Sequence, residues 1–172
     1  GPIGGGNSWI VSGRQSLFDG AFKHFLRGPA PLSFYDVFFK ATMGNETGRN
    51  SVRGFFSGDD ITSDKPDEPN HSWRNQAFAM SFSGLAYDHL YVDGVAYTSK
   101  FTVTRDAKGS TVARPAESWV GDDGMRLEFT IHTDSRDVFF TGFQFDLPEY
   151  DYTYSTLSNT ERTFSSVDTE LW

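Results

Sequence analysis

The chain has 172 residues, with 15 Lys and Arg against 23 Asp and Glu, and its formal net charge is -8 at pH 7. Because no cluster of basic residues offsets this acidity, the composition argues against binding to the phosphate backbone of nucleic acids. The chain has no cysteine, which excludes disulfides and thiolate metal sites. Its length is typical of one domain.

Aromatic residues make up 16% of the chain, including 17 Phe, whereas all hydrophobic types together reach only 37%. We therefore expect a few bulky rings to supply most of the buried volume, which favours strands over helices. No run of apolar residues is long enough to span a bilayer, and no charged start precedes a short apolar segment. The sequence predicts neither membrane insertion nor a signal peptide in these residues.

The first residues, GPIGGG, resemble a scar of tag removal followed by a linker. We assign residues 1–7 to this scar and linker, and residues 8–172 to a single β-sandwich domain cut from a longer protein. Residues 8–12 are predicted to form a short strand. Residues 16–28 have apolar side chains at helical spacing and end at Gly28-Pro29, which favours a helix, although Asp19-Gly20 would also suit a hairpin turn.

From residue 32 the apolar residues recur with a period of two, which predicts a strand that ends at Gly44-Asn45. One face of this strand carries Tyr35, Val37, Phe39, Ala41 and Met43. Residues 52–56 are predicted to form another short strand. Residues 58–75 are polar, contain two prolines and lack periodicity, so they are predicted to form one long loop.

Beyond this loop, the alternation of Phe78, Met80 and Phe82 with small residues predicts a strand with one packed face. Asp93-Gly94 is predicted to be a two-residue hairpin turn that sets Val92 opposite Val95. Two further acidic turns are predicted in the same way, at residues 106–109, with Val103 opposite Val112, and at residues 121–124, with Val120 opposite Met125. The acidic residues at these places are explained by turn chemistry alone.

The clearest strand alternates Met125, Leu127, Phe129 and Ile131 with polar residues. After a polar break at residues 134–137, a connection of odd length would align Leu127 with Phe143 and Met125 with Phe145, and burial favours this register. Pro148 is predicted to end the following strand. A further strand carries Tyr150, Tyr152 and Tyr154 on one face, and residues 163–171 close the chain as a last strand.

These elements amount to about nine or ten strands with one short early helix. The pattern predicts an all-β fold, an antiparallel β-sandwich or jelly roll.

No motif of a common catalytic class is found. The histidines lack metal-ligand spacing, and the chain contains no phosphate-binding loop, no nucleophile elbow and no zinc-protease helix. Carboxylates are plentiful, and a glycosidase would need two of them on either side of a glycosidic bond. The candidate pairs are Asp59-Asp60, Asp122-Asp123, and Asp146 with Glu149 and Asp151. We expect a non-catalytic protein.

Calcium is the cofactor that the sequence best supports, because a hard cation takes six to eight oxygen ligands and loops between strands can supply them. The candidate ligands are Asp59, Asp60 and Asp64, with Asp67 and Glu68 close by in the predicted loop. No fixed ligand motif is present.

The candidate ligand-binding residues are Trp73, Tyr150, Tyr152 and Tyr154. Sugars have apolar ring faces bordered by hydroxyl groups, so an exposed aromatic ring near carboxylates suits them. The alternative is that the tyrosines are half-buried core residues whose hydroxyls reach the surface.

The leading hypothesis for function is a recognition module that binds a glycan or a protein receptor. It would be part of an extracellular, cell-surface or virion structure such as an adhesin or a phage appendage. The first alternative is a structural assembly domain, such as a capsid projection or fibre tip, that forms homo-oligomers. The second alternative is a β-sandwich polysaccharide hydrolase.

Overall fold

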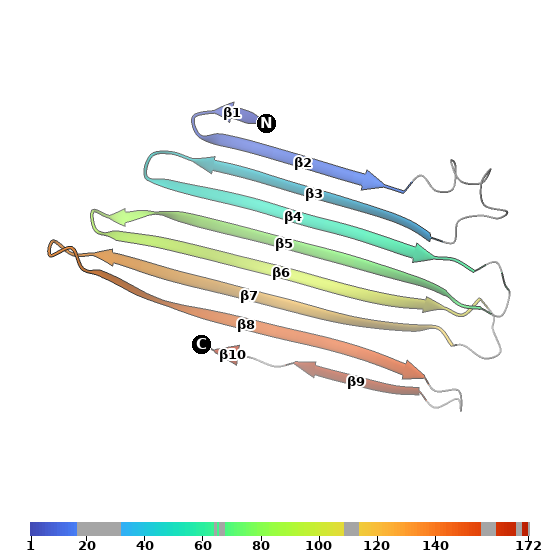
Figure 1. The fold of residues 1–172 in the computed structure, drawn as a ribbon. Helices are drawn as coiled ribbons and strands as arrows, with labels where there is room; N and C mark the ends of the chain where they lie inside the picture. The colour runs from blue at the N-terminus through green and yellow to red at the C-terminus, as the bar shows by residue number, and fades with distance from the viewer. Residues whose placement is uncertain are drawn as a thin grey trace.

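The computed structural model describes residues 1–16, 32–63, 65, 68–108, 114–155, 161–167 and 170–171. These residues form ten strands of one antiparallel sheet (Figure 1). In chain order the strands are β1 (Pro2–Gly4), β2 (Asn7–Gln15), β3 (Leu32–Gly44), β4 (Gly48–Ile61), β5 (Asn70–Tyr87), β6 (Leu90–Asp106), β7 (Ala116–His132), β8 (Val138–Ser155), β9 (Glu161–Val167) and β10 (Glu170–Leu171). The described residues include no helix, so none of them forms a helix that is long and apolar enough to cross a membrane.

The strands follow one another as a meander, in which each strand from β1 to β8 lies beside its neighbours in the sequence (Figure 1). Both β9 and β10 pair with β8, at different places along its length. The sheet is open, with β1 at one edge and the two short C-terminal strands at the other. The all-β antiparallel class is therefore confirmed, whereas the described strands do not form the second layer of a sandwich or jelly roll.

One face of the sheet carries an apolar row that crosses seven strands. Directly paired residues of antiparallel strands point to the same side, so the register defines this row. Its members, from β2 to β8, are Trp9, Ala41, Val52, Met80, Ala96, Met125 and Phe145. Neighbouring rows on the same side add Phe39, Phe78, Phe82, Leu127 and Phe143. We call this side the apolar face.

The opposite side, which we call the mixed face, has a different composition. At the level of the apolar row its paired residues include Ser51, Ser81, Val95, Arg126 and Gln144. Aromatic residues gather instead toward one end of this face. Because the sheet is a single layer, both faces are accessible, and Ala107 is the one buried hydrophobic residue in the described part of the chain.

Glycines under aromatic rings explain why one predicted hairpin is wrong. Asp93 and Gly94 lie in the middle of β6, where Gly94 pairs with Phe82 on β5 and with Leu127 on β7. The ring of Phe82 covers Gly94 so closely that a Cβ there would collide with it. The glycine therefore provides room for a ring rather than a turn. The hairpin between β5 and β6 turns near residues 88–89, where Tyr87 pairs with Leu90.

The predicted turn at residues 121–124 is also wrong, because these residues continue β7 and Gly121 pairs with both Lys100 and Glu149. The chain does leave β6 at Asp106, as predicted, and Lys108 has a positive φ of 46°. The predicted partner of Val103 is wrong, however, because Val103 pairs with Ser118. In both cases the sequence suggests short hairpins where the strands are in fact long.

Several predicted strands and one register are confirmed. The strand from residue 32 is β3, with Tyr35, Val37 and Phe39 on one side. Phe78, Met80 and Phe82 share a side of β5. The alignment of Leu127 with Phe143 and of Met125 with Phe145 is as predicted, across a connection of odd length at residues 133–137. Here strict alternation of bulky and polar residues was sufficient to define both the strand and its register.

Pro148 does not end its strand, which corrects another prediction. It lies inside β8 and pairs with Asp122 on β7. On the other side of β8, the pairing with β10 covers Phe145 and Asp146, and the pairing with β9 begins at Glu149. Proline thus occupies the short gap between two partner strands, where no edge hydrogen bond is required. The predicted last strand, residues 163–171, is accordingly two strands, β9 and β10.

The long loop predicted at residues 58–75 is much shorter in the structure. Strand β4 continues to Ile61 and β5 begins at Asn70, so Trp73 lies in a strand. Polar residues do not end a strand when both of its faces meet solvent, and this explains the wrong prediction. Residues 17–31, which include nearly all of the predicted helix, lie outside the described residues. Pro2–Gly4 pairs with β2, while the origin of residues 1–7 as a scar and linker stays a prediction.

Candidate functional site

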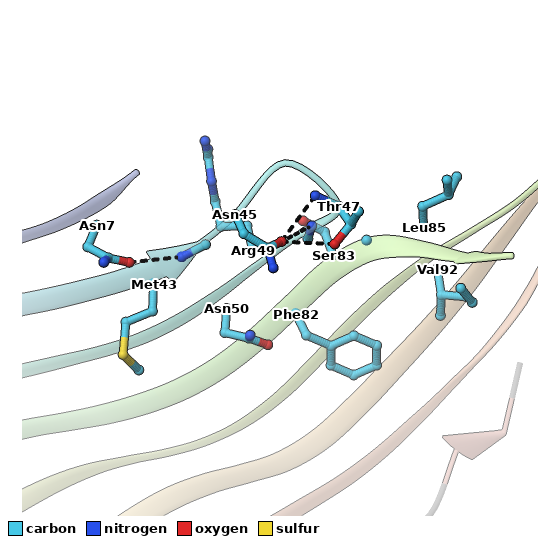
Figure 2. Close-up of a pocket in the computed structure, with 14 residues that line it drawn as sticks. Asn7, Met43, Asn45, Thr47, Arg49, Asn50, Phe82, Ser83, Leu85 and Val92 are labelled. Carbon is cyan, nitrogen blue, oxygen red and sulfur yellow. Dashed lines mark hydrogen bonds between the residues drawn. The ribbon is translucent and has the colours of Figure 1, made fainter. Parts of the chain in front are cut away.

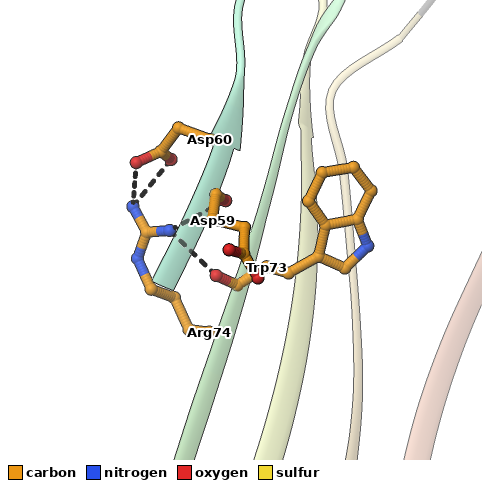
Figure 3. Close-up of polar contacts among 4 residues, drawn as sticks. All are labelled: Asp59, Asp60, Trp73 and Arg74. Atoms are coloured by element: carbon orange, nitrogen blue, oxygen red, sulfur yellow. Dashed lines mark hydrogen bonds and ion pairs between the residues drawn. The ribbon is translucent and has the colours of Figure 1, made fainter. Parts of the chain in front are cut away.

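Trp73 and Arg74 are neighbours in β5 and project to opposite sides of the sheet (Figure 3). The Arg74 guanidinium lies on the side of the apolar face, where its Nη2 donates to the two carboxylate oxygens of Asp60 at 2.8 and 3.1 Å. Its Nη1 donates to the backbone carbonyls of Asp59 and Trp73 at 3.2 and 2.9 Å. These bonds hold the backbone of β4 and β5 together at the point where Trp73 projects onto the mixed face.

The mixed face contains a hollow of about 590 Å³ near this end of the sheet. Its apolar lining comes from three adjacent strands: Phe101 and Val103 on β6, Val120 on β7, and Tyr150 and Tyr152 on β8. We call it the aromatic hollow. Its volume lies in the range of ligand sites in proteins, ~300–1,000 Å³.

The register brings these side chains together. Phe101 pairs with Val120, and Val120 pairs with Tyr150, so the three form one row across β6, β7 and β8. Trp73 pairs with Val103 in the next row. Tyr152 lies two residues beyond Tyr150 and therefore on the same side. Both tyrosine rings are accessible, with 43% of Tyr150 and 53% of Tyr152 exposed.

Polar groups border the aromatic hollow. His71 contributes to its lining and stacks on Trp73, with ring centroids 6.1 Å apart and an interplanar angle of 24°. Arg105 also lines the hollow, and its Nε donates to the backbone carbonyl of Arg114 at 2.8 Å. Ser118 Oγ accepts a hydrogen bond from the backbone N–H of Thr153 at 2.9 Å, which ties β7 to β8 beneath the rings. The rim therefore offers a ring nitrogen and a cation beside the apolar lining.

Three of the four predicted ligand-binding residues thus reach one end of the mixed face. Tyr150 and Tyr152 line the hollow directly, and Trp73 adjoins it through His71. Tyr154 belongs to β8, but its side chain lies outside the described part of the structure. Sequence reasoning missed Phe101 and His71. Their shared parity with Val103 and Trp73 was the available signal. The loop predicted at residues 58–75 obscured it for His71, and the turns predicted at Asp93-Gly94 and at residues 121–124 obscured it for Phe101.

The predicted calcium ligands are not gathered in one loop. Asp59 and Asp60 are successive residues of β4, so their side chains project to opposite faces, and Asp60 is paired with Arg74. Asp64 lies outside the described residues. Nowhere in the described part of the chain do three or more His, Asp or Glu residues form a group that could hold a metal ion. Calcium binding stays a prediction.

The carboxylate pairs proposed for a hydrolase are also divided between the faces. Asp122 and Asp123 are successive residues of β7, and Asp146 projects to the opposite side from Glu149 and Asp151 on β8. Asp146 accepts a hydrogen bond from the Tyr97 hydroxyl at 2.5 Å and from Gln144 Nε2 at 2.6 Å. These bonds lower the pKa of the Asp146 carboxyl below its usual value, and the same carboxylate raises the pKa of the Tyr97 hydroxyl.

A second hollow, of about 690 Å³, lies at the other end of the sheet (Figure 2). Met43, Asn50, Phe82 and Val92 project into it from the apolar face. The hairpin above it is held by Asn45, whose Oδ1 accepts hydrogen bonds from the backbone N–H groups of Thr47 and Gly48 at 3.0 and 2.9 Å. These bonds form a local turn, so the polar groups on this side of the hollow have a structural role in the hairpin.

In comparisons with known proteins, no protein-family model, curated protein or solved structure matches the chain.

Proposed function

We propose that the protein is a non-catalytic recognition module that binds a glycan in the aromatic hollow. The observation that supports this function best is that Tyr150 and Tyr152, both about half exposed, line one hollow with Phe101 and Val120. Exposed aromatic rings in a hollow offer a flat apolar surface on which a ligand can stack. The hydroxyl groups of that ligand can stay in contact with solvent at the rim. A pyranose ring, apolar on its faces and polar at its edges, has the matching chemistry.

The rim supports a neutral or acidic sugar rather than a nucleic acid. Arg105 and His71 both line the hollow, and two such groups do not make a basic patch. The chain as a whole has a net charge of -8, which opposes the binding of polyanions. Binding of this kind suits the predicted role in an extracellular, cell-surface or virion adhesin or appendage.

The test is a glycan array followed by calorimetric titration of the best oligosaccharide. Tyr150→Ala and Tyr152→Ala should each weaken binding about tenfold, or ~1.4 kcal/mol, since each removes one stacking surface. Tyr87→Ala is the matched control, because Tyr87 is 78% exposed at the opposite end of β5 and outside the hollow. Equal losses in all three variants, or an array without signal, would contradict the proposal.

The alternative target is a protein receptor, and an assay of binding to cells distinguishes it from a glycan. Binding to cells should disappear when their surface glycans are removed enzymatically. Binding that survives this treatment, and that Tyr152→Ala abolishes, would assign the hollow to a protein partner.

The predicted two-layered sandwich also stays a proposal. One chain supplies a single layer in its described residues, so we assign the sandwich to an assembled state of the protein.

A further inference from the structure

The apolar face has the composition of a buried surface, although nothing in the chain's described residues covers it. Between the row of Phe39 and the end of the sheet near Phe139, the side chains that project to this face from β2 to β8 are uncharged apart from Asp123 at the margin. The other charged groups of this side, among them Arg74, Lys100 and Glu149, lie toward the opposite end. Charge is thus confined to one margin of the face.

A stable interface needs ~800 Å² of surface from each partner. The described strands form one open layer, so this area can come from one of its two faces.

The apolar face alone is large enough for such an interface. Each side chain on one face of a sheet occupies roughly 33 Å², because strands lie about 4.8 Å apart and residues of one face about 6.8 Å apart along a strand. The uncharged area spans β2 to β8 and is three to five residues deep, so its footprint is roughly 900 Å² per chain. A monomer rarely leaves a contiguous apolar patch larger than ~600 Å² exposed.

The methionines provide an independent indication. The chain has three, Met43, Met80 and Met125, and all of them project to the apolar face. They are accessible in the single chain, with exposed fractions of 61%, 55% and 41%. Methionine is enriched in the cores of protein interfaces, where its flexible side chain fills gaps between two surfaces.

We propose that two copies of this chain pack apolar face against apolar face and form a two-layered β-sandwich in the dimer. A two-fold axis makes the face its own partner, so one self-complementary surface is sufficient. Side chains of two facing sheets interdigitate at a spacing of about 10 Å, and the apolar rows of the two copies would supply this core. The inference goes beyond the proposed function, because the aromatic hollow lies on the mixed face and remains accessible on both outer surfaces of the dimer.

The first test is the mass of the full chain in solution, measured by sedimentation velocity over a range of concentrations. We expect a dimer, with twice the chain mass of 19.3 kDa. Met80→Glu places a charge in the middle of the apolar row, so it should weaken dimerisation at least a hundredfold. A strictly monomeric wild-type protein, or a Met80→Glu variant that dimerises as well as the wild type, would overturn the proposal.

Two neighbouring residues of β2 provide a matched pair of variants. Val11 projects to the apolar face and Ile10 to the mixed face, and their exposed fractions are 62% and 51%. Val11→Glu should weaken dimerisation at least tenfold, whereas Ile10→Glu should leave it unchanged. Equal effects of the two changes would contradict a face-to-face dimer, and circular dichroism checks that both variants keep their strands.

A second measurement does not depend on mutation. Methionine oxidation by hydrogen peroxide, followed by mass spectrometry, should slow at least tenfold for Met80 and Met125 as the protein concentration rises through the dimer range. Dimers in which both methionines oxidise at the monomer rate would refute the proposed interface. Flotation of a monomeric chain with phosphatidylcholine vesicles would assign the apolar face to lipid instead and would equally overturn the dimer.

Discussion

The two faces of the sheet are made by the same strands yet differ in how they hold together. On the apolar face, rings from one strand lie over glycines of the next, as Phe39 does over Gly54 and Phe82 over Gly94. On the mixed face, side chains are joined by hydrogen bonds, as Tyr97 is to Asp146 and Ser51 to Ser81. The difference is one of extent, since Tyr97 also covers Gly124 on the mixed face, and the apolar face has an ion pair, Arg74 with Asp60, at its charged margin. A single layer can thus separate a surface for assembly from a surface for recognition.

The largest effect on stability is expected where a side chain is added beneath a ring of the apolar face. Gly94→Val would put its branched side chain where the ring of Phe82 and the side chain of Leu127 lie. We expect the free energy of unfolding to fall by ~1–3 kcal/mol, which urea denaturation would measure.

The control for this change is Gly13→Ala on β2. A Cβ at Gly13 would meet its nearest neighbour, the backbone carbonyl of Asp36, at 3.6 Å, an ordinary contact distance. Its unfolding free energy should remain within about 0.5 kcal/mol of the wild type. A Gly94→Val protein as stable as the Gly13→Ala protein would show that the rings are not packed on the glycines.

A smaller effect is expected at the charged margin of the apolar face. Arg74→Ala removes the paired hydrogen bonds to Asp60, the bonds to two backbone carbonyls, and the contact of the guanidinium with the Tyr35 ring at 6.0 Å. Because both charged groups are partly exposed, solvent screens the ion pair, and we expect a loss of about 1 kcal/mol in unfolding free energy. Arg74→Lys should recover little of it, since lysine cannot form the paired bonds.

On the mixed face, the Tyr97–Asp146 hydrogen bond should appear in the pH dependence of stability. The bond lowers the pKa of Asp146, so its contribution is present above the usual range of aspartate and is lost as the pH falls through the lowered pKa. It raises the pKa of Tyr97, so that contribution is present below the usual range of tyrosine and is lost as the pH rises.

Tyr97→Phe removes both contributions. The pKa of Asp146, followed by carboxyl NMR titration, should rise toward its usual value, and the acid side of the stability profile should become less steep. An unchanged Asp146 pKa in Tyr97→Phe would mean that Gln144, the other hydrogen-bond donor to this carboxylate, determines it alone.

The smallest effect is expected at Lys65, which belongs to neither face. Lys65 Nζ donates to Glu68 Oε1 at 2.6 Å on the exposed connection between β4 and β5. This bond and that from Ser63 lower the pKa of Glu68. Lys65→Ala should raise the Glu68 pKa in an NMR titration without a measurable change in unfolding, since exposed ion pairs contribute little. A clear loss of stability would mean that the connection matters as much as the faces do.

Alternation of side chains made most of the sheet predictable. The strands around Phe39, Met80 and Leu127 were identified from it, and so was the register of Leu127 with Phe143. The pattern could not reveal that Gly94, which follows Asp93, leaves room for the Phe82 ring of the adjacent strand. That need arises only once the strands are paired, so a local sequence signal favours a turn instead.

The number of layers was not predictable either. A chain rich in Phe is expected to bury its rings within itself, and the sequence therefore predicts two layers. The same alternation is equally compatible with one layer whose apolar side meets another molecule. For the aromatic hollow, the roles of Tyr150 and Tyr152 could be proposed from their spacing, whereas Phe101 depends on the register of β6 with β7.

The meander has a consequence for how the molecule forms and breaks. Since each strand from β1 to β8 contacts only its neighbours in the sequence, the sheet behaves as a linear series of hairpins. Each hairpin can form before its neighbours join it, so folding should spread from an early hairpin toward both ends. Hydrogen exchange should then be slowest at β5 and β6 in the middle and progressively faster toward β1 and β9, because the sheet opens from its edge strands.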